Sequence, residues 1–268
     1  MPPKRLRKLN GNVLKLIAVI TMLIDHIGAG IIYPAYNEEL LPGGVFYDNI
    51  QIIYRIIRSI GRTAFPLFCF LLVEGFVHTK SRLRYALSLL VFAIISEVPY
   101  DLLINCRENE FSLNIISVLK QNSCYLGLSC NVMFTLLIGL IVLAASESVS
   151  KSAEHFALPV SAKYLVSLIP IGVGIFLANF IKCDYKGYGV ALIAILYLLR
   201  DMDFVAPLVG YAMFATYSTE AYSLPAFILM LFYSKKRGRR LGRLKYLFYA
   251  IYPIHLLFYY ALRCLLFM

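Results

Sequence analysis

The stretch Lys15–His26, which reads KLIAVITMLIDH, decides the fold class of this chain. It is apolar enough to enter a lipid bilayer, yet it ends in an aspartate and a histidine. A charged side chain at the centre of a membrane helix costs about 2.5–3.5 kcal/mol on insertion scales. Because a helix that keeps such groups usually has a partner or a use for them, the stretch predicts a membrane helix that carries a functional site.

The composition of the whole chain also indicates a membrane protein. Of its 268 residues, 60% are hydrophobic and only 15% are charged, and the mean hydropathy is +0.73. Soluble domains are less apolar and more charged. The apolar runs are long and continuous, which favours helices over a β-barrel. We therefore predict an all-α, polytopic transmembrane helical bundle in which residues 1–268 form a single integral-membrane domain.

About nine apolar segments are predicted to cross the bilayer, since a spanning helix needs about 20 residues. They are Asn12–Tyr33, Ile50–Val77, Tyr85–Ile104, Asn131–Ala145, Tyr164–Ile181, Tyr188–Leu199, Phe204–Tyr217, Ala221–Tyr233 and Tyr246–Phe267. The second segment is longer than one span needs, so its first half is a candidate interfacial helix and Pro66 a candidate kink.

Basic side chains are concentrated in alternate connecting segments, namely 1–11, 80–84, 146–163, 200–203 and 234–245. The positive-inside rule places such segments in the cytoplasm. We therefore predict a cytoplasmic N-terminus and, with an odd number of spans, an external C-terminus. These segments also account for the net charge of +11, which does not indicate nucleic-acid binding because the chain has no zinc-finger spacing and no basic amphipathic groove.

Lys15 and His26 lie on one face of the first predicted helix. Eleven steps of about 100° bring them within about 20° of each other, and about 16 Å separates them along the axis. This arrangement suits a long anionic ligand that enters from the cytoplasm, with the imidazole accepting a proton from an amine or hydroxyl. The alternative is that Lys15 snorkels and His26 makes a structural hydrogen bond. Asp25 points about 100° away and is expected to pair elsewhere.

Three arginines, Arg55, Arg58 and Arg62, recur at the i, i+3, i+7 spacing of one helical stripe. Guanidinium groups bind phosphate or carboxylate bidentately, so the stripe predicts an anion site. Ion pairs with acids in the spans, or contacts with lipid headgroups, are the alternative. Arg62 is the deepest of the three and is the preferred functional residue.

Four acids are candidate ion-pair partners for the arginines: Asp25, Glu74 in FLLVEGF, and Glu97 and Asp101 in SEVPYD. Asp184 lies in CDYKGYG beside two glycines, at a predicted outer helix end. Glu97 and Asp101 lie four residues apart on one helix face, where they are expected to orient the histidine or to hold arginines.

Two further polar residues lie in apolar segments: Asn131 opens NVMFT, and His255 ends YAIYPIH. For this second imidazole, a functional and a structural role both stay open. No histidines and acids have the spacing of metal ligands, and no glycine-rich phosphate loop is present. Cys106, Cys124 and Cys130 share one predicted outer loop, where a disulfide and a role as small apolar residues both stay open.

These motifs resemble the TraX family in the same order. The resemblance rests on KLIAVITMLIDHIG, RSIGRTAFPLFCFLLVEGFVHT, ISEVPYDL, NVMFTLLIG, CDYKGYG and YAIYPIH, which cover nearly the whole chain. TraX-family proteins are polytopic membrane proteins, and the founding member N-acetylates the pilin subunit of a conjugative pilus. The family looks distantly related to larger membrane acyltransferases with a Lys/Arg-x10-His pattern, which Lys15 and His26 satisfy. Those acyltransferases also carry an Arg-x-x-Arg motif after their second span. Arg55 and Arg58 have its spacing but lie in the first, candidate interfacial half of the second segment, and Arg82 and Arg84 lie at the expected place with the wrong spacing, so the motif is left unassigned.

The resemblance implies a bacterial inner-membrane enzyme that transfers acetyl from cytoplasmic acetyl-CoA to a peptide or glycan acceptor. It implies that His26 is the general base, that Asp25 and Glu74 belong to the catalytic group, and that Arg62 stabilises the oxyanion. The implied cofactor-binding residues are Lys15, Arg58, Lys80, Arg82, Arg84 and His255. The remaining polar cluster comprises Glu97, Asp101, Asn131 and Asp184. A second copy of the chain is a candidate partner.

Two other hypotheses stay open. A proton-coupled transporter would also use Asp, Glu and His residues within the membrane. It predicts an internal inverted repeat, whereas no second copy of IDHIG or GRTAFP is seen. A membrane scaffold without chemistry would leave the arginines and acids of the spans unexplained.

Overall fold

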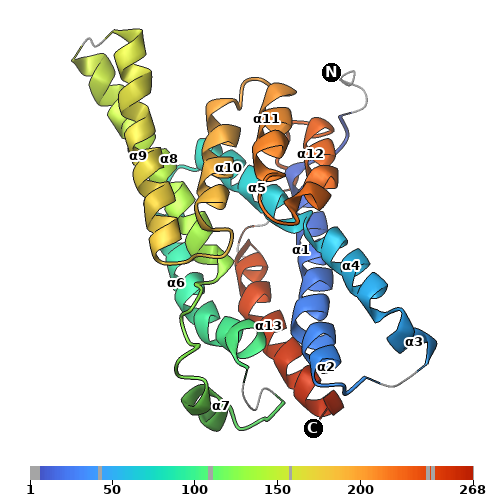
Figure 1. The fold of residues 1–268 in the computed structure, drawn as a ribbon. Coiled ribbons are helices and arrows are strands. Elements are labelled where there is room, and N and C mark those ends of the chain that lie inside the picture. Colours follow the sequence, from blue (N-terminus) through green and yellow to red (C-terminus); the bar gives the residue numbers. More distant parts are fainter. Residues whose placement is uncertain are drawn as a thin grey trace.

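Helices connected by loops build the part of the chain that the structure, a computed structural model, describes (Figure 1). The described residues are 7–41, 44–107, 111–156, 159–239, 242 and 245–267. Within these ranges, extended pairing is limited to two isolated bridges, between Leu9 and Tyr233 and between Cys130 and Cys183. The all-α fold class is confirmed.

Long helices alternate with short ones along the chain. In order, the helices are α1 (Gly11–Ile27), the π-helix η2 (Gly28–Ile32), α2 (Tyr33–Asn37), α3 (Val45–Asp48), α4 (Ile50–Gly61), α5 (Ala64–His78), α6 (Arg82–Tyr100), the π-helix η3 (Asp101–Asn105), α7 (Ile115–Gln121), α8 (Val132–His155), α9 (Val160–Phe180), α10 (Lys186–Leu198), α11 (Val205–Phe214), the 3-10 helix η4 (Glu220–Ser223), α12 (Leu224–Leu231) and α13 (Lys245–Phe267).

Among the residues that the structure describes, five helical segments are long and apolar enough to cross a membrane. They are Gly11–Asn37, Ile50–His78, Arg82–Asn105, Val132–His155 and Tyr246–Phe267. Four shorter apolar helices, Leu165–Phe180, Lys186–Leu198, Val205–Phe214 and Glu220–Leu231, have only 10–17 residues each. A helix needs about 20 residues to span the hydrocarbon core, so helix length supports five spans and not the predicted nine or so.

The second long segment breaks at Arg62 and Thr63, between α4 and α5. The predicted kink at Pro66 is therefore misplaced by three or four residues. Pro66 lies in the first turn of α5, where its missing N–H removes no helical hydrogen bond. On α4, Ile52, Ile56 and Ile60 form an exposed apolar stripe, which suits a helix that lies against lipid.

α1 lies at the centre of the bundle, where it contacts α4, α5 and α13. α8 and α9 form a hairpin that packs on α6 and α10 and whose connecting end projects beyond the other helices, while α10, α11 and α12 gather beside α5 (Figure 1). Leu14, Ala18 and Met22 line the buried side of α1. The packing places the end of α1, which carries Asp25 and His26, between α4 and α13.

Arg263 of α13 joins the two π-helices. Its side chain is fully buried and donates hydrogen bonds to the carbonyls of Gly30, Leu102 and Leu103 at 3.2, 2.9 and 3.1 Å. A π-helical turn alters the regular ladder of backbone hydrogen bonds, and these carbonyls accept from the guanidinium. Gly30 permits the close approach, since a Cβ there would lie 2.5 Å from a methyl carbon of Leu103.

The cysteines are all free thiols. Cys106 is buried, Cys124 is exposed and Cys130 is half-buried, so the disulfide considered for their loop is not formed. Cys130 instead pairs through its backbone with Cys183, which ties the beginning of α8 to the loop between α9 and α10.

Candidate functional site

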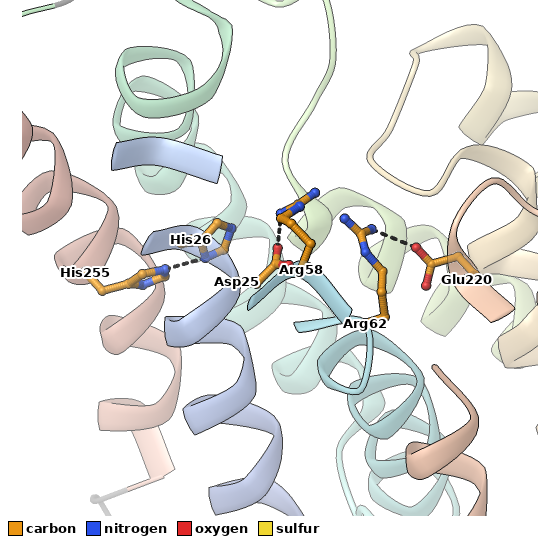
Figure 2. A network of polar contacts seen from close by, with 6 residues as sticks. All are labelled: Asp25, His26, Arg58, Arg62, Glu220 and His255. Atoms are coloured by element: carbon orange, nitrogen blue, oxygen red, sulfur yellow. Dashed lines mark hydrogen bonds and ion pairs between the residues drawn. The ribbon is translucent and has the colours of Figure 1, made fainter. Parts of the chain in front are cut away.

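Two imidazoles from the first and last long helices meet inside the bundle. His255 Nε2 lies 2.8 Å from His26 Nδ1, although 229 positions separate the residues in the sequence (Figure 2). His255 is 6% exposed. The ring of Tyr252 lies against both histidines, with ring centroids 6.2 Å from His26 and 5.6 Å from His255. The pair is therefore held by packing from α13.

The hydrogen bonds fix which ring nitrogen carries each proton. His255 Nδ1 lies 2.7 Å from the carbonyl of Ile251, which can only accept, so this nitrogen must donate. In a neutral His255 ring, Nε2 is then an acceptor, and His26 Nδ1 must donate to it. His26 Nε2 is left with the lone pair. In Figure 2 this nitrogen lies on the side of the ring away from His255, towards Asp25 and Arg58.

Asp25 pairs with Arg58, as the direction of its side chain on the first helix predicts. Arg58 Nη1 lies 2.5 Å from Asp25 Oδ2. The other carboxylate oxygen, Oδ1, is buried and makes no hydrogen bond within the described chain. It packs against Gly61, where a Cβ would lie only 2.0 Å away. The glycine therefore lets α4 approach α1 closely enough to form the ion pair.

A second ion pair joins Arg62 to Glu220 at 2.7 Å (Figure 2). The Glu220 side chain is 1% exposed, and the contact links positions 158 residues apart. The contact joins Arg62 Nη1 to Glu220 Oε1. The other carboxylate oxygen, Glu220 Oε2, and the guanidinium nitrogen Arg62 Nε are buried and make no hydrogen bond in the described structure. A buried ion pair with unused donors and acceptors leaves capacity to bind another polar group.

A cavity of about 360 Å³ lies beside these ion pairs, and the three arginines of the stripe line it together, as their helical spacing predicts. Asp184 and Glu220 line the same cavity. Burial raises the pKa of the Asp184 carboxyl to about 6, although the nearby Arg62 lowers it in part. The cavity thus combines both signs of charge, and two of the arginines that line it, Arg58 and Arg62, act electrostatically on His26.

Glu74 and Lys15 lie elsewhere. Glu74 accepts a hydrogen bond of 2.7 Å from the Tyr233 hydroxyl and lines a small cavity of about 50 Å³ with Arg200. The structure therefore does not bring Glu74 to His26. Lys15 lies with its Nζ 4.9 Å from the centre of the Phe248 ring.

The three basic residues of the linker, Lys80, Arg82 and Arg84, differ in their exposure and their partners. Arg82 is 2.7 Å from Glu147 and covers the ring of Phe76, so an acid already occupies the side chain that was expected to bind nucleotide phosphates. Lys80 and Arg84 are exposed. The structure does not group these three residues with Lys15 in a hydrogen-bonded cluster.

Glu97 and Asp101 serve a structural network and contact neither the histidines nor the arginines. Glu97 accepts from the Asn131 side chain, whose own oxygen caps α8 by accepting from the Met133 amide at 3.0 Å. Asp101 accepts from the Asn105 side chain at 2.6 Å. The expectation that these acids orient the histidine or hold arginines is wrong, because the carboxylates accept hydrogen bonds from Asn131 and Asn105 instead.

Neither Glu220 nor Arg263 is indicated by a motif. Glu220 is a single acid at the edge of an apolar segment, and Arg263 is a single arginine within one. The groups that hydrogen-bond to their side chains lie more than 150 positions away in the sequence. The only signal that could have identified them is the cost of a charge in such a segment. Among the residues that the structure describes, no three His, Cys, Asp or Glu side chains group closely enough to hold a metal ion.

The fold and the site define a helical membrane protein with a buried imidazole pair beside two ion pairs. A family profile described as TraX protein matches residues 10–263, so this chain belongs to the TraX family, as its motifs suggest. It is 30% identical over 264 residues to "Probable fimbrial assembly protein FimC, serogroup H1" of Dichelobacter nodosus, covering 94% of this chain and 93% of that protein. No solved structure matches the chain.

Proposed function

We propose that this protein is a transmembrane acetyltransferase that moves an acetyl group from cytoplasmic acetyl-CoA to an amine or hydroxyl of an extracytoplasmic or membrane-associated acceptor. Membership of the TraX family and the relative named as a fimbrial assembly protein favour a peptide acceptor, with a glycan as the other class. The observation that carries the proposal is the hydrogen-bonded pair of His26 and His255, which leaves the Nε2 lone pair of His26 free to accept a proton.

The basic connecting segments lie on the cytoplasmic side of a bacterial inner membrane in this proposal, as the positive-inside rule describes. Segment 235–239 packs over the beginning of α1, where the Gly11 amide donates to the Lys236 carbonyl at 2.9 Å. Arg237 acts electrostatically on Lys15. Two neighbouring cations suit the phosphates of coenzyme A, about 16 Å along α1 from His26.

The acceptor nitrogen or oxygen attacks the thioester carbonyl, and its proton passes to His26 Nε2. His26 Nδ1 gives its own proton to His255 Nε2, so two imidazoles share the positive charge. The carbon–sulfur bond then breaks and the acetyl group stays on the acceptor. The thiolate of coenzyme A takes up one proton as the two imidazoles return to their starting state, which balances the reaction.

The arginines supply the electrostatic part of the mechanism. Negative charge develops on the carbonyl oxygen during the attack, and fixed donors at that place lower the barrier. Arg58 and Arg62 are held by Asp25 and Glu220 and act electrostatically on His26. In the proposed mechanism, one of these guanidinium groups stabilises the oxyanion.

The test measures hydrolysis of radiolabelled acetyl-CoA by purified protein in lipid nanodiscs, with and without acceptor peptides. His26→Ala is expected to lower the rate by about 10²–10⁴-fold, the usual contribution of a general base. His155→Ala serves as the matched control, since that histidine is exposed at the end of α8. Equal rates in the His26 variant and the control would reject the proposal.

A further inference from the structure

A second cavity adjoins the arginine-lined one. It has a volume of about 480 Å³ and is lined by Tyr100, Ser129, Lys182 and Lys186, among others. Asp184, Tyr185 and Tyr217 line both cavities. The two cavities therefore adjoin at these three residues, and we call the pair the double groove, with Asp184 at the junction.

The loop that carries Asp184 is held in a strained conformation. Lys182, Tyr185 and Lys186 have φ angles of +52°, +59° and +47°, in the left-handed region that side chains other than glycine rarely adopt. Tyr185 stacks flat on Phe65, with ring centroids 3.7 Å apart and an interplanar angle of 3°. Because such strain persists only where the surrounding structure enforces it, this loop has the character of a functional site.

The backbone of Cys130 fixes the same loop. The Asp184 amide donates to the Cys130 carbonyl at 2.8 Å, and the Cys130 amide donates to the Lys182 carbonyl at 3.2 Å. The backbone of the loop that carries Asp184, Lys182 and Lys186 is therefore tied to the beginning of α8.

Charge is distributed in a pattern along the double groove. Acidic groups lie in the middle, where Asp184 lines both cavities and Glu220 Oε2 is buried without a hydrogen bond in the described structure. Arg55 lines the arginine-lined cavity, and Lys182 and Lys186 line the second cavity. Within the described ranges, these three cations make no ion pair with an acid, in contrast to Arg58 and Arg62. The double groove therefore offers unpaired positive charge on both sides of the shared Asp184.

We propose that the double groove binds the acceptor as an extended peptide that carries acidic side chains on both sides of the group to be acetylated. This inference rests on the proposed function where it says that the bound peptide is acetylated, but the binding of the peptide does not depend on that function. One acidic side chain meets Arg55, and the other meets Lys182 and Lys186. Between them, the peptide backbone crosses Asp184 beside the two ion pairs, of which Asp25–Arg58 adjoins His26, and the tyrosines that line the groove pack against the peptide. Complementary charge at both ends sets the register of the bound peptide.

The test measures binding without catalysis. Full-length protein in nanodiscs of phosphatidylcholine is titrated with fluorescent peptides of equal length that carry glutamate, glutamine or lysine at the same positions, and fluorescence anisotropy is recorded. The glutamate peptide is expected to bind most tightly. Arg55→Glu is expected to weaken it by about tenfold and to improve binding of the lysine peptide.

A second variant and a control make the result specific. Lys182→Glu combined with Lys186→Glu is expected to shift the preference in the same direction as Arg55→Glu. Lys120→Glu is the matched control, because Lys120 is an exposed cation of α7 that lines neither cavity. Arg55, Lys182 and Lys186 are exposed, so reversing their charge leaves the buried core intact.

The outcomes separate this inference from the proposed function. Peptide binding that ignores charge, or that changes equally in the Lys120 control, would overturn the inference. If an anionic polysaccharide binds and none of the peptides does, the inference is also overturned. His26→Ala with normal acetyl-CoA turnover would reject the proposed function, yet it would leave the charge preference of peptide binding measurable.

Discussion

Replacing His255 separates a chemical role of the imidazole pair from a structural one. His255→Phe keeps an aromatic ring at this position but removes the nitrogen that accepts from His26 Nδ1 at 2.8 Å. We expect turnover of acetyl-CoA to fall by about 10²–10⁴-fold, because His26 loses the partner that fixes its tautomer and shares its proton.

The expected sizes of the two effects differ enough to decide the matter. A fall of 10²–10⁴-fold corresponds to about 3–5 kcal/mol of activation free energy. A hydrogen bond between uncharged groups contributes only about 0.5–1.5 kcal/mol to the free energy of unfolding. If the His26–His255 hydrogen bond is purely structural, its loss should therefore lower the melting temperature modestly and change the rate of acetyl-CoA turnover little.

The assay compares kcat and KM for acetyl-CoA hydrolysis in His255→Phe and His255→Gln, together with their melting temperatures in nanodiscs. The glutamine oxygen can accept the same hydrogen bond, so this variant should recover part of kcat. KM should change little in both variants. If His255→Phe melts several degrees lower while kcat is unchanged, the pair is structural and the proton-sharing mechanism is refuted.

Three further predictions follow from the described contacts. Arg263→Leu leaves three buried carbonyls without a donor and should lower the melting temperature strongly, while Arg263→Lys, with no planar fork, should rescue only part of it. Gly61→Ala places a Cβ against Asp25 Oδ1 and should displace the Asp25–Arg58 pair, which a lower kcat and a lower melting temperature would reveal. Because burial raises the pKa of Asp184 from 3.8 to about 6, the stability that this carboxyl supplies is complete below pH 3.8 and lost as the pH rises through 6. Melting temperatures measured from pH 4 to pH 8 should therefore fall more in the natural protein than in Asp184→Asn, and parallel curves would contradict this assignment.

Local patterns were sufficient for much of the fold. The apolar runs predict the long helices, because entry into lipid depends on the summed hydropathy of about 20 consecutive residues. The i, i+3, i+7 spacing predicts that the three arginines share one cavity, since neighbours on a helix are set by its pitch. The same reasoning overcounted the spans, because short apolar helices that pack among longer ones have the same composition as spanning helices.

The partners of the polar residues could not be predicted in this way. Glu97 and Asp101 were expected to orient the histidine or to hold arginines, but they accept hydrogen bonds from Asn131 and Asn105. Glu74 has the same kind of apolar setting as a catalytic acid, yet it pairs with Tyr233. An acid in an apolar segment indicates only that some partner exists, and packing selects which one.

The sequence by itself determined that this protein is a helical membrane protein with ionisable groups inside its helices, since both properties depend on residues that are close together in the chain. Only the tertiary structure decided that His26 meets His255, across 229 positions, and that Arg62 meets Glu220, across 158. No helical period links residues so far apart. Their contact arises from the way that whole helices pack, and the packing depends on all the buried side chains together.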